Sequence, residues 1–124
     1  MDLTSNMFSG TIPDLQALSS LTLLDLGSNQ LYGTIPFGAF PRSLQFLTLS
    51  GNEFEGAIST KIGQLSLLEV LNLATNLGMD STIPTEIGRL VNLRELEMDS
   101  CNLSGSIPSW IGQLTELVTL RLSK

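Results

Sequence analysis

The hydrophobic residues of this chain follow one phrase that recurs along its length. In its fullest form the phrase is LxxLxLxxNxLxGxIP, seen in the stretch LTLLDLGSNQLYGTIP. The same place in successive units is held by Asn6, Asn29, Asn52, Asn76 and then Cys101. These residues stand 23 to 25 positions apart, and a fixed period in this range indicates a solenoid of stacked coils.

The LxL part of each unit predicts a short strand. Successive strand residues point to opposite faces, so the two Leu are buried and the residue between them is exposed. Six such strands are expected, stacked in parallel, with the exposed central residues Asp2, Asp25, Thr48, Asn72, Glu97 and Arg121. Their outward faces would form one continuous inner wall of the solenoid.

The other recurring positions predict how each coil turns and returns. A buried Asn donates and accepts hydrogen bonds with turn backbone that would otherwise lack partners. The Gly tolerates a conformation or close approach that a Cβ would obstruct, and IP combines a core Ile with an extended backbone. The IGQL or IGRL that follows places two apolar residues three apart, as a short 3₁₀ turn would bury them: Ile62 and Leu65, Ile87 and Leu90, Ile111 and Leu114.

Some units depart from the phrase at single positions. Ser59 replaces Pro, Ser81 replaces Gly, Cys101 replaces Asn, and one extra residue lies near Gly78. Each change affects one coil, so we expect local distortion and an unchanged fold. Cys101 is expected to act as a small buried filler.

The full pattern LxxLxLxxNxLxGxIPxxIGxLxxL resembles the plant-type leucine-rich repeats of receptor-like kinases, receptor-like proteins and polygalacturonase-inhibitor proteins. The resemblance implies an α/β-type leucine-rich repeat solenoid, a right-handed superhelix with a parallel concave β-sheet and short 3₁₀ or irregular convex segments. It implies a single array over residues 1–124, of about five repeats plus a terminal partial repeat. It also implies a place in a cell-surface or extracellular parent protein that recognises a protein, a peptide or a cell-wall carbohydrate.

Composition narrows the function further. Twelve acidic and six basic residues give a formal charge of −6, which repels nucleic acid and anionic membranes. Histidine is absent and there is one cysteine, so the usual general base, the usual metal ligand and an internal disulfide are all missing. No phosphate-binding loop, membrane-spanning run or signal sequence is present. We therefore expect no enzyme, no catalytic or metal site and no cofactor.

The two ends of the array show no terminal caps. Solenoids usually cover their end coils with a polar face, whereas Leu3, Phe8 and Ile12 at one end and Leu120 and Leu122 at the other would lie near open faces. We expect an interior fragment of a longer protein. The alternative is an assembly module whose uncapped coils associate end to end.

The candidate binding residues come from the exposed columns of the inner wall, because the buried positions of a solenoid serve its architecture. Leu23, Phe46 and Val70 occupy one column in three successive coils, about 5 Å apart, and predict an apolar ridge. The alternative is that neighbouring side chains or a loop cover this ridge. The predicted ligand-binding set is completed by an acidic strand face and three flanking polar residues: Glu95, Glu97, Asp99, Asp25, Thr48 and Asn72.

Other chemistry is conceivable at the acidic face. Carboxylates two apart on a strand are about 6.5 to 7 Å apart at Cα, which overlaps the separation used in glycoside hydrolysis. No pocket is predicted that would raise the pKa of one of them, so a solvated acidic face is favoured over a glycosidase or a weak Ca²⁺ site. Separately, Asn102-Leu103-Ser104 is a candidate glycosylation acceptor at Asn102.

Overall fold

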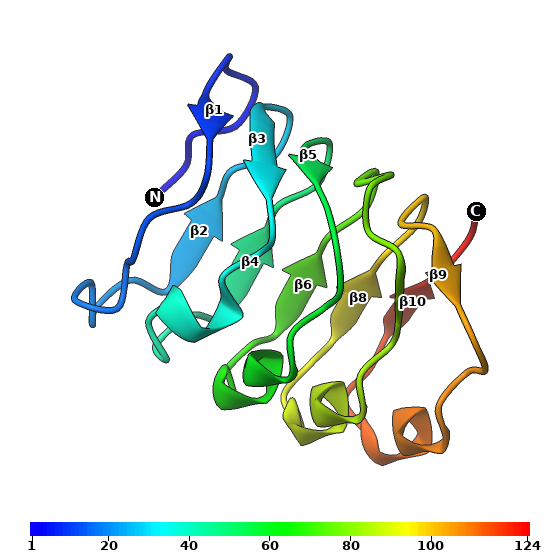
Figure 1. The fold of residues 1–124 in the computed structure, drawn as a ribbon. Helices are drawn as coiled ribbons and strands as arrows, with labels where there is room; N and C mark the ends of the chain where they lie inside the picture. Colours follow the sequence, from blue (N-terminus) through cyan, green and yellow to red (C-terminus); the bar gives the residue numbers. More distant parts are fainter.

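The main sheet runs the length of the stack. The computed structural model describes all 124 residues, and Figure 1 shows successive coils lying side by side from the N-terminus to the C-terminus. The main sheet is parallel, with its strands in chain order: β2 (Leu23–Asp25), β4 (Phe46–Thr48), β6 (Val70–Asn72), β8 (Glu95–Glu97) and β10 (Thr119–Arg121). The predicted leucine-rich repeat solenoid is confirmed. The first expected strand is reduced to one bridge between Asp2 and Asp25.

A second set of short strands lies across the coils from the main sheet (Figure 1). One sheet contains β1 (Ser9–Gly10), β3 (Gln30–Gly33) and β5 (Glu53–Phe54), and another contains β7 (Ser81–Thr82) and β9 (Leu103–Ser104). Between them only the single bridge Glu55–Gly78 remains. The sequence predicted an extended backbone in this region but no sheet, and the break falls in the coil that has the extra residue.

Four 3₁₀ helices line the convex side: η1 (Phe37–Ala39), η2 (Thr60–Gln64), η3 (Thr85–Arg89) and η4 (Ser109–Gln113). The last three confirm the predicted turns. Pro precedes η3 and η4, whereas Ser59 precedes η2 and accepts a hydrogen bond from the Lys61 backbone N–H through its side chain. Ser59 thus caps the first turn, which explains why this coil folds without the Pro.

The core is one continuous column of Leu, Ile and Phe side chains. Leu24, Leu47, Leu71 and Leu96, one from each successive strand, are at most 1% exposed. They belong to a single cluster that extends through the coils. The predicted burial of the LxL leucines is therefore confirmed for these coils, whereas Leu120 of β10 is 39% exposed. Burial of this apolar surface drives the stacking.

The recurring Asn residues join each coil to the one before it. Asn52 donates to the carbonyl oxygens of Leu26 (2.9 Å) and Leu49 (3.1 Å), and its amide oxygen accepts from the Leu31 N–H (3.0 Å). Asn29 and Asn76 repeat the arrangement. The predicted role of the Asn is confirmed, with the addition that its partners lie in two coils.

The end coils are less covered than the interior ones. Ile107 was expected in the core, but its side chain is 74% exposed. The prediction was wrong because each IP isoleucine is covered by the coil that follows, and Ile107 belongs to the last full coil of the structure. No helix of the protein is long and apolar enough to cross a membrane.

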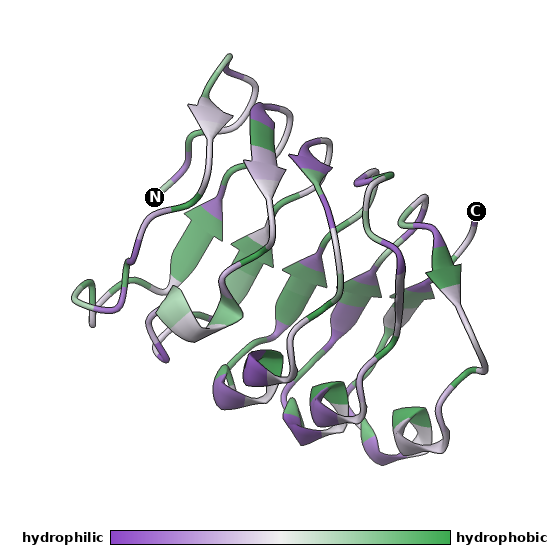
Figure 2. Cartoon of the chain, in the orientation of Figure 1, coloured by the Kyte–Doolittle hydropathy of each residue, from purple (hydrophilic) through white to green (hydrophobic).

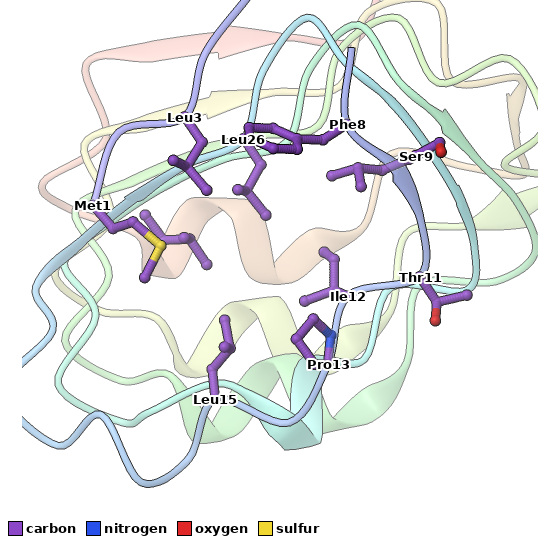
Figure 3. A pocket seen from close by; sticks show the side chains of 11 residues that line it. Met1, Leu3, Phe8, Ser9, Thr11, Ile12, Pro13, Leu15 and Leu26 are labelled. Atoms are coloured by element: carbon purple, nitrogen blue, oxygen red, sulfur yellow. The ribbon is translucent and has the colours of Figure 1, made fainter. Parts of the chain in front are cut away.

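A cavity of about 250 Å³ opens at the N-terminal end of the core. Figure 3 shows Met1, Leu3, Phe8, Ile12 and Leu15 arranged around it. Leu3, Phe8 and Ile12 occupy repeat positions that are buried in the interior coils, where Leu26, Leu31 and Ile35 take their places. The cavity is therefore the end face of the core, and another coil of the same kind would fill it.

Candidate ligand-binding surface

The strand register brings the predicted ridge residues together. Leu23 pairs with Phe46, Phe46 with Val70, and Val70 with Glu95. Paired residues of neighbouring strands lie about 4.8 Å apart, and their side chains share one face of the sheet. The column predicted from the repeat is thus a physical column on the concave face.

The ridge is accessible on this face. Leu23 is 41% exposed, and Phe46 and Val70 are half-buried. In Figure 2 the main sheet is hydrophobic along β2, β4 and β6 and becomes largely hydrophilic at β8. Neighbouring side chains cover part of Phe46 and Val70, but the ridge still presents apolar surface to solvent.

The next column carries a polar network that spans three strands. The Asn72 side-chain amide donates to a Glu97 carboxylate oxygen at 2.7 Å. The other Glu97 oxygen lies 3.4 Å from Nε of Arg121, in an ion pair whose side chains are 21% and 64% exposed respectively. An exposed pair of this kind contributes about 0 to 1 kcal/mol to stability, so its main effect is to fix the Glu97 side chain.

Two other predicted site residues accept hydrogen bonds, Asp25 within its own coil and Asp99 from the following coil. The carboxylate of Asp25 accepts from the Gly27 N–H at 2.9 Å. The carboxylate of Asp99 accepts from the hydroxyl of Ser123 (2.7 Å) and from its N–H (2.9 Å). The Ser123 hydroxyl, followed by the N–H, lowers the pKa of Asp99. Thr48 pairs with Asp25 on one side and with Asn72 on the other, and it is half-buried.

The three acidic residues of the β8 region therefore differ in their surroundings. Glu97 is engaged by Asn72 and Arg121, Asp99 is engaged by Ser123, and the Glu95 side chain has no hydrogen-bond or ion-pair partner. No group of three or more acidic side chains gathers as metal ligands would. Glu95 is exposed and Glu97 is paired with Arg121, so neither carboxylate stands unpaired in apolar surroundings, as a general acid requires.

Two polar hollows beside this face were not predicted from the sequence. One is lined by Glu69, Asn92, Arg94 and Glu116, at the rim where the strands begin. These residues lie one to three positions before the exposed column that contains Val70 and Glu95. The repeat therefore carries the signal that would predict them. The other hollow includes Glu53, Glu55 and Leu77. Leu77 is 72% exposed, in the coil with the extra residue.

The candidate glycosylation acceptor is on the surface. Asn102 is exposed, with a left-handed backbone conformation (φ 48°), in the turn directly before β9. Ser104, the third residue of the acceptor sequence, is exposed as well.

Comparison with solved structures gives the same fold. The chain is 35% identical to the plant peptide hormone receptor RGFR1, solved in complex with RGF2, with a TM-score of 0.90 over 99% of this chain and 20% of that one. It is 35% identical to the Arabidopsis receptor kinase HAESA, solved with the peptide hormone IDA and the co-receptor SERK1, with a TM-score of 0.85 over 99% of this chain and 21% of that one.

A shorter relative is covered more fully. The structure of the BIR3–SERK2 complex from Arabidopsis thaliana matches with 33% identity and a TM-score of 0.81, over 100% of this chain and 69% of that one. The chain spans only about a fifth of the length of RGFR1 and HAESA. A search of curated proteins returned no match.

The family follows from the sequence itself. The family model for the Leucine Rich Repeat matches residues 20–41, 43–65 and 92–114, which together make up more than half of the chain. The solved structures most like it include ectodomains of plant receptor kinases. The chain belongs to the leucine-rich repeat family, in its plant type.

Proposed function

We propose that this chain is a recognition module that binds a peptide or protein ligand on its concave face, as part of a receptor-like protein at the cell surface. The structures of RGFR1 and HAESA hold those receptors with the peptides RGF2 and IDA. This chain covers only about a fifth of the length of those receptors. Its own exposed residues therefore indicate the kind of ligand.

The observation that carries the proposal is the apolar ridge of Leu23, Phe46 and Val70. These three apolar side chains are aligned on an otherwise polar sheet face. Covering them with a partner lowers the free energy, because it removes apolar surface from water. A peptide supplies matching apolar side chains. A carbohydrate fits less well, because Phe46 is the only aromatic side chain on the five strands of this sheet.

The role is binding and not catalysis. The carboxylates of the face are solvated or paired, and the chain has no histidine. A hydrolysis screen comparing the parent chain with Glu97→Gln checks this point. Carboxylate-dependent release of sugar by the parent chain alone would overturn it.

The binding proposal is tested with a random peptide library displayed on phage and selected on the immobilised protein. Peptides that are enriched should lose most of their binding to Phe46→Asp, because a carboxylate in the ridge cannot be matched by apolar side chains. Val91→Asp is the matched control, since Val91 is also exposed (55%) but lies outside the concave columns. Equal binding to both variants, with both folded, would contradict the proposal.

A further inference from the structure

The concave face changes character between two neighbouring strands. Along β2, β4 and β6 the column presents Leu23, Phe46 and Val70, and at β8 the same column presents Glu95. Figure 2 shows the corresponding change from hydrophobic to hydrophilic along the sheet. The carboxylate of Glu95 thus stands at the end of the apolar ridge, one strand spacing from Val70.

Glu95 is the carboxylate on this face without a partner of its own. Glu97 accepts from Asn72 and pairs with Arg121, and Asp99 accepts from Ser123. Arg94 precedes Glu95 in the sequence, but it lines the rim hollow and makes no ion pair within 4.0 Å. The charge of Glu95 is therefore uncompensated, in a chain whose net charge is −6.

We propose that Glu95 selects the ligand's charge: the face binds an extended peptide whose apolar side chain lies over Phe46 and Val70 and whose Lys or Arg side chain reaches Glu95. This inference rests on the proposed function and adds the chemistry of the ligand to it. An apolar peptide would leave Glu95 partly desolvated without a partner, and an acidic peptide would be repelled. The stem of a Lys or Arg also covers apolar surface such as Val70.

The geometry sets the spacing of the two groups in the peptide. Phe46 and Glu95 are separated by two strand spacings, or about 10 Å. An extended peptide of the polyproline II type advances about 3.1 Å per residue and brings a side chain back to the same side at every third residue, so the cation should stand about three residues from the apolar anchor.

The experiment uses the peptides enriched on the unmodified protein in the library selection. They should carry Lys or Arg about three positions from an apolar residue. The most enriched peptide is synthesised, and its affinity is measured for the parent chain, Glu95→Gln and Glu95→Lys. Glu53→Gln is the matched control, because Glu53 is also an exposed carboxylate but lies on β5, outside the concave sheet.

Binding should weaken about three- to tenfold in Glu95→Gln and further in Glu95→Lys, with no change in Glu53→Gln. A peptide with its Lys or Arg replaced by Glu should bind Glu95→Lys better than it binds the parent chain. Equal thermal unfolding of the variants establishes that each is folded.

The outcomes separate the two proposals. Peptides that depend on Phe46 but carry no cation, or that bind Glu95→Gln unchanged, overturn the role of Glu95 and leave the binding face intact. If no peptide is enriched, or if enriched peptides ignore Phe46→Asp, the proposed function itself is wrong and this inference fails with it.

Discussion

The backbone N–H of Met79 donates a hydrogen bond to the carbonyl oxygen of Asn76, 3.1 Å away in its own turn. In the three preceding coils the equivalent N–H, such as that of Leu31, donates to the side chain of the Asn of the following coil. In the coil with the extra residue, the acceptor for the Met79 N–H therefore lies within the same turn. Because the Met79 N–H is already paired, the residue in the Asn position of the next coil does not have to accept from it. That residue is Cys101, whose thiol donates to the carbonyl oxygen of Leu73, 3.0 Å away. The inserted residue and the replacement of Asn by Cys101 are therefore compatible with each other.

The Asn position should be among the most sensitive in the chain. Replacement of Asn52 by Ala removes the acceptor of the buried Leu31 N–H and the donors to two carbonyl oxygens. We expect the free energy of unfolding to fall by about 3 kcal/mol, since each unsatisfied buried group costs about 1 to 3 kcal/mol. Asn92→Ala is the control, because Asn92 is exposed and makes one hydrogen bond, to the carbonyl oxygen of Ser66. Urea unfolding of the two variants measures the two free energies. Equal losses of stability in Asn52→Ala and Asn92→Ala would refute the structural role given to Asn52.

The thiol of Cys101 should be inert in the folded protein. Its side chain is 1% exposed, and burial raises the pKa of the thiol. A thiol-specific disulfide reagent at neutral pH should therefore label it only after unfolding in urea. Rapid labelling under native conditions would show that this coil opens or that the thiol is accessible.

The same pKa shift predicts a pH dependence of stability. Because the pKa of the Cys101 thiol is higher in the folded state, its contribution is complete below the ordinary thiol pKa and is lost as the pH rises through the folded value. The parent chain should lose stability in this alkaline range more steeply than Cys101→Ala. Parallel curves for the two proteins would contradict the prediction.

Gly56 is required by its backbone conformation and by the preceding coil. Gly56 has a φ of +76°, and a Cβ there would lie 3.3 Å from the methyl carbon of Thr34. Gly56→Ala should lower the free energy of unfolding by about 1 to 2 kcal/mol. Gly112→Ala should change it by less than about 0.5 kcal/mol, because no atom lies within 4 Å of its Cβ position. Thermal unfolding of both variants measures the two losses of stability. Equal losses for Gly56→Ala and Gly112→Ala would show that the backbone at Gly56 does not require a glycine.

Replacement of Thr75 by Gly should stabilise the protein. The residue before each Asn has a left-handed backbone, and here Thr75 has a φ of 59° where the equivalent Gly51 has 64°. A β-branched side chain is strained in this conformation. Thr75→Gly should therefore raise the free energy of unfolding by about 0.5 to 1 kcal/mol, and Gly51→Thr should lower it. Denaturant midpoints that move in the same direction for both variants would contradict this reasoning.

The sequence predicted the features that follow from the regular repetition of its coils. The period, the burial of residues such as Leu47 and the column of Leu23, Phe46 and Val70 all follow from one repeated phrase. Features that depend on more than this repetition were not predicted. The second sheet requires a matched register across coils, and the exposure of Ile107 depends on which coil lies beside it.

The same distinction applies to the candidate site. The repeat placed Glu95, Glu97 and Asp99 on one strand face, but it could not show which of them is free. That depends on side-chain orientation, because Asn72, Arg121 and Ser123 engage Glu97 and Asp99 from other strands and coils. Only the structure singles out Glu95.

The acceptor sequence at Asn102 should be used when the protein passes through a eukaryotic secretory pathway. Asn102 and Ser104 are both exposed, and the Asn102 side chain makes no hydrogen bond that a glycan would break. The turn lies beside β9 and away from the concave strands, so a glycan there would leave the ligand face free. Protein secreted from such cells should carry one N-glycan, seen as a mass that an N-glycan-removing amidase reduces and that is absent from both Asn102→Gln and Ser104→Ala. An unmodified parent chain, or a glycan that persists in either variant, would refute the assignment, and unchanged peptide binding after glycosylation would place the ligand away from this turn.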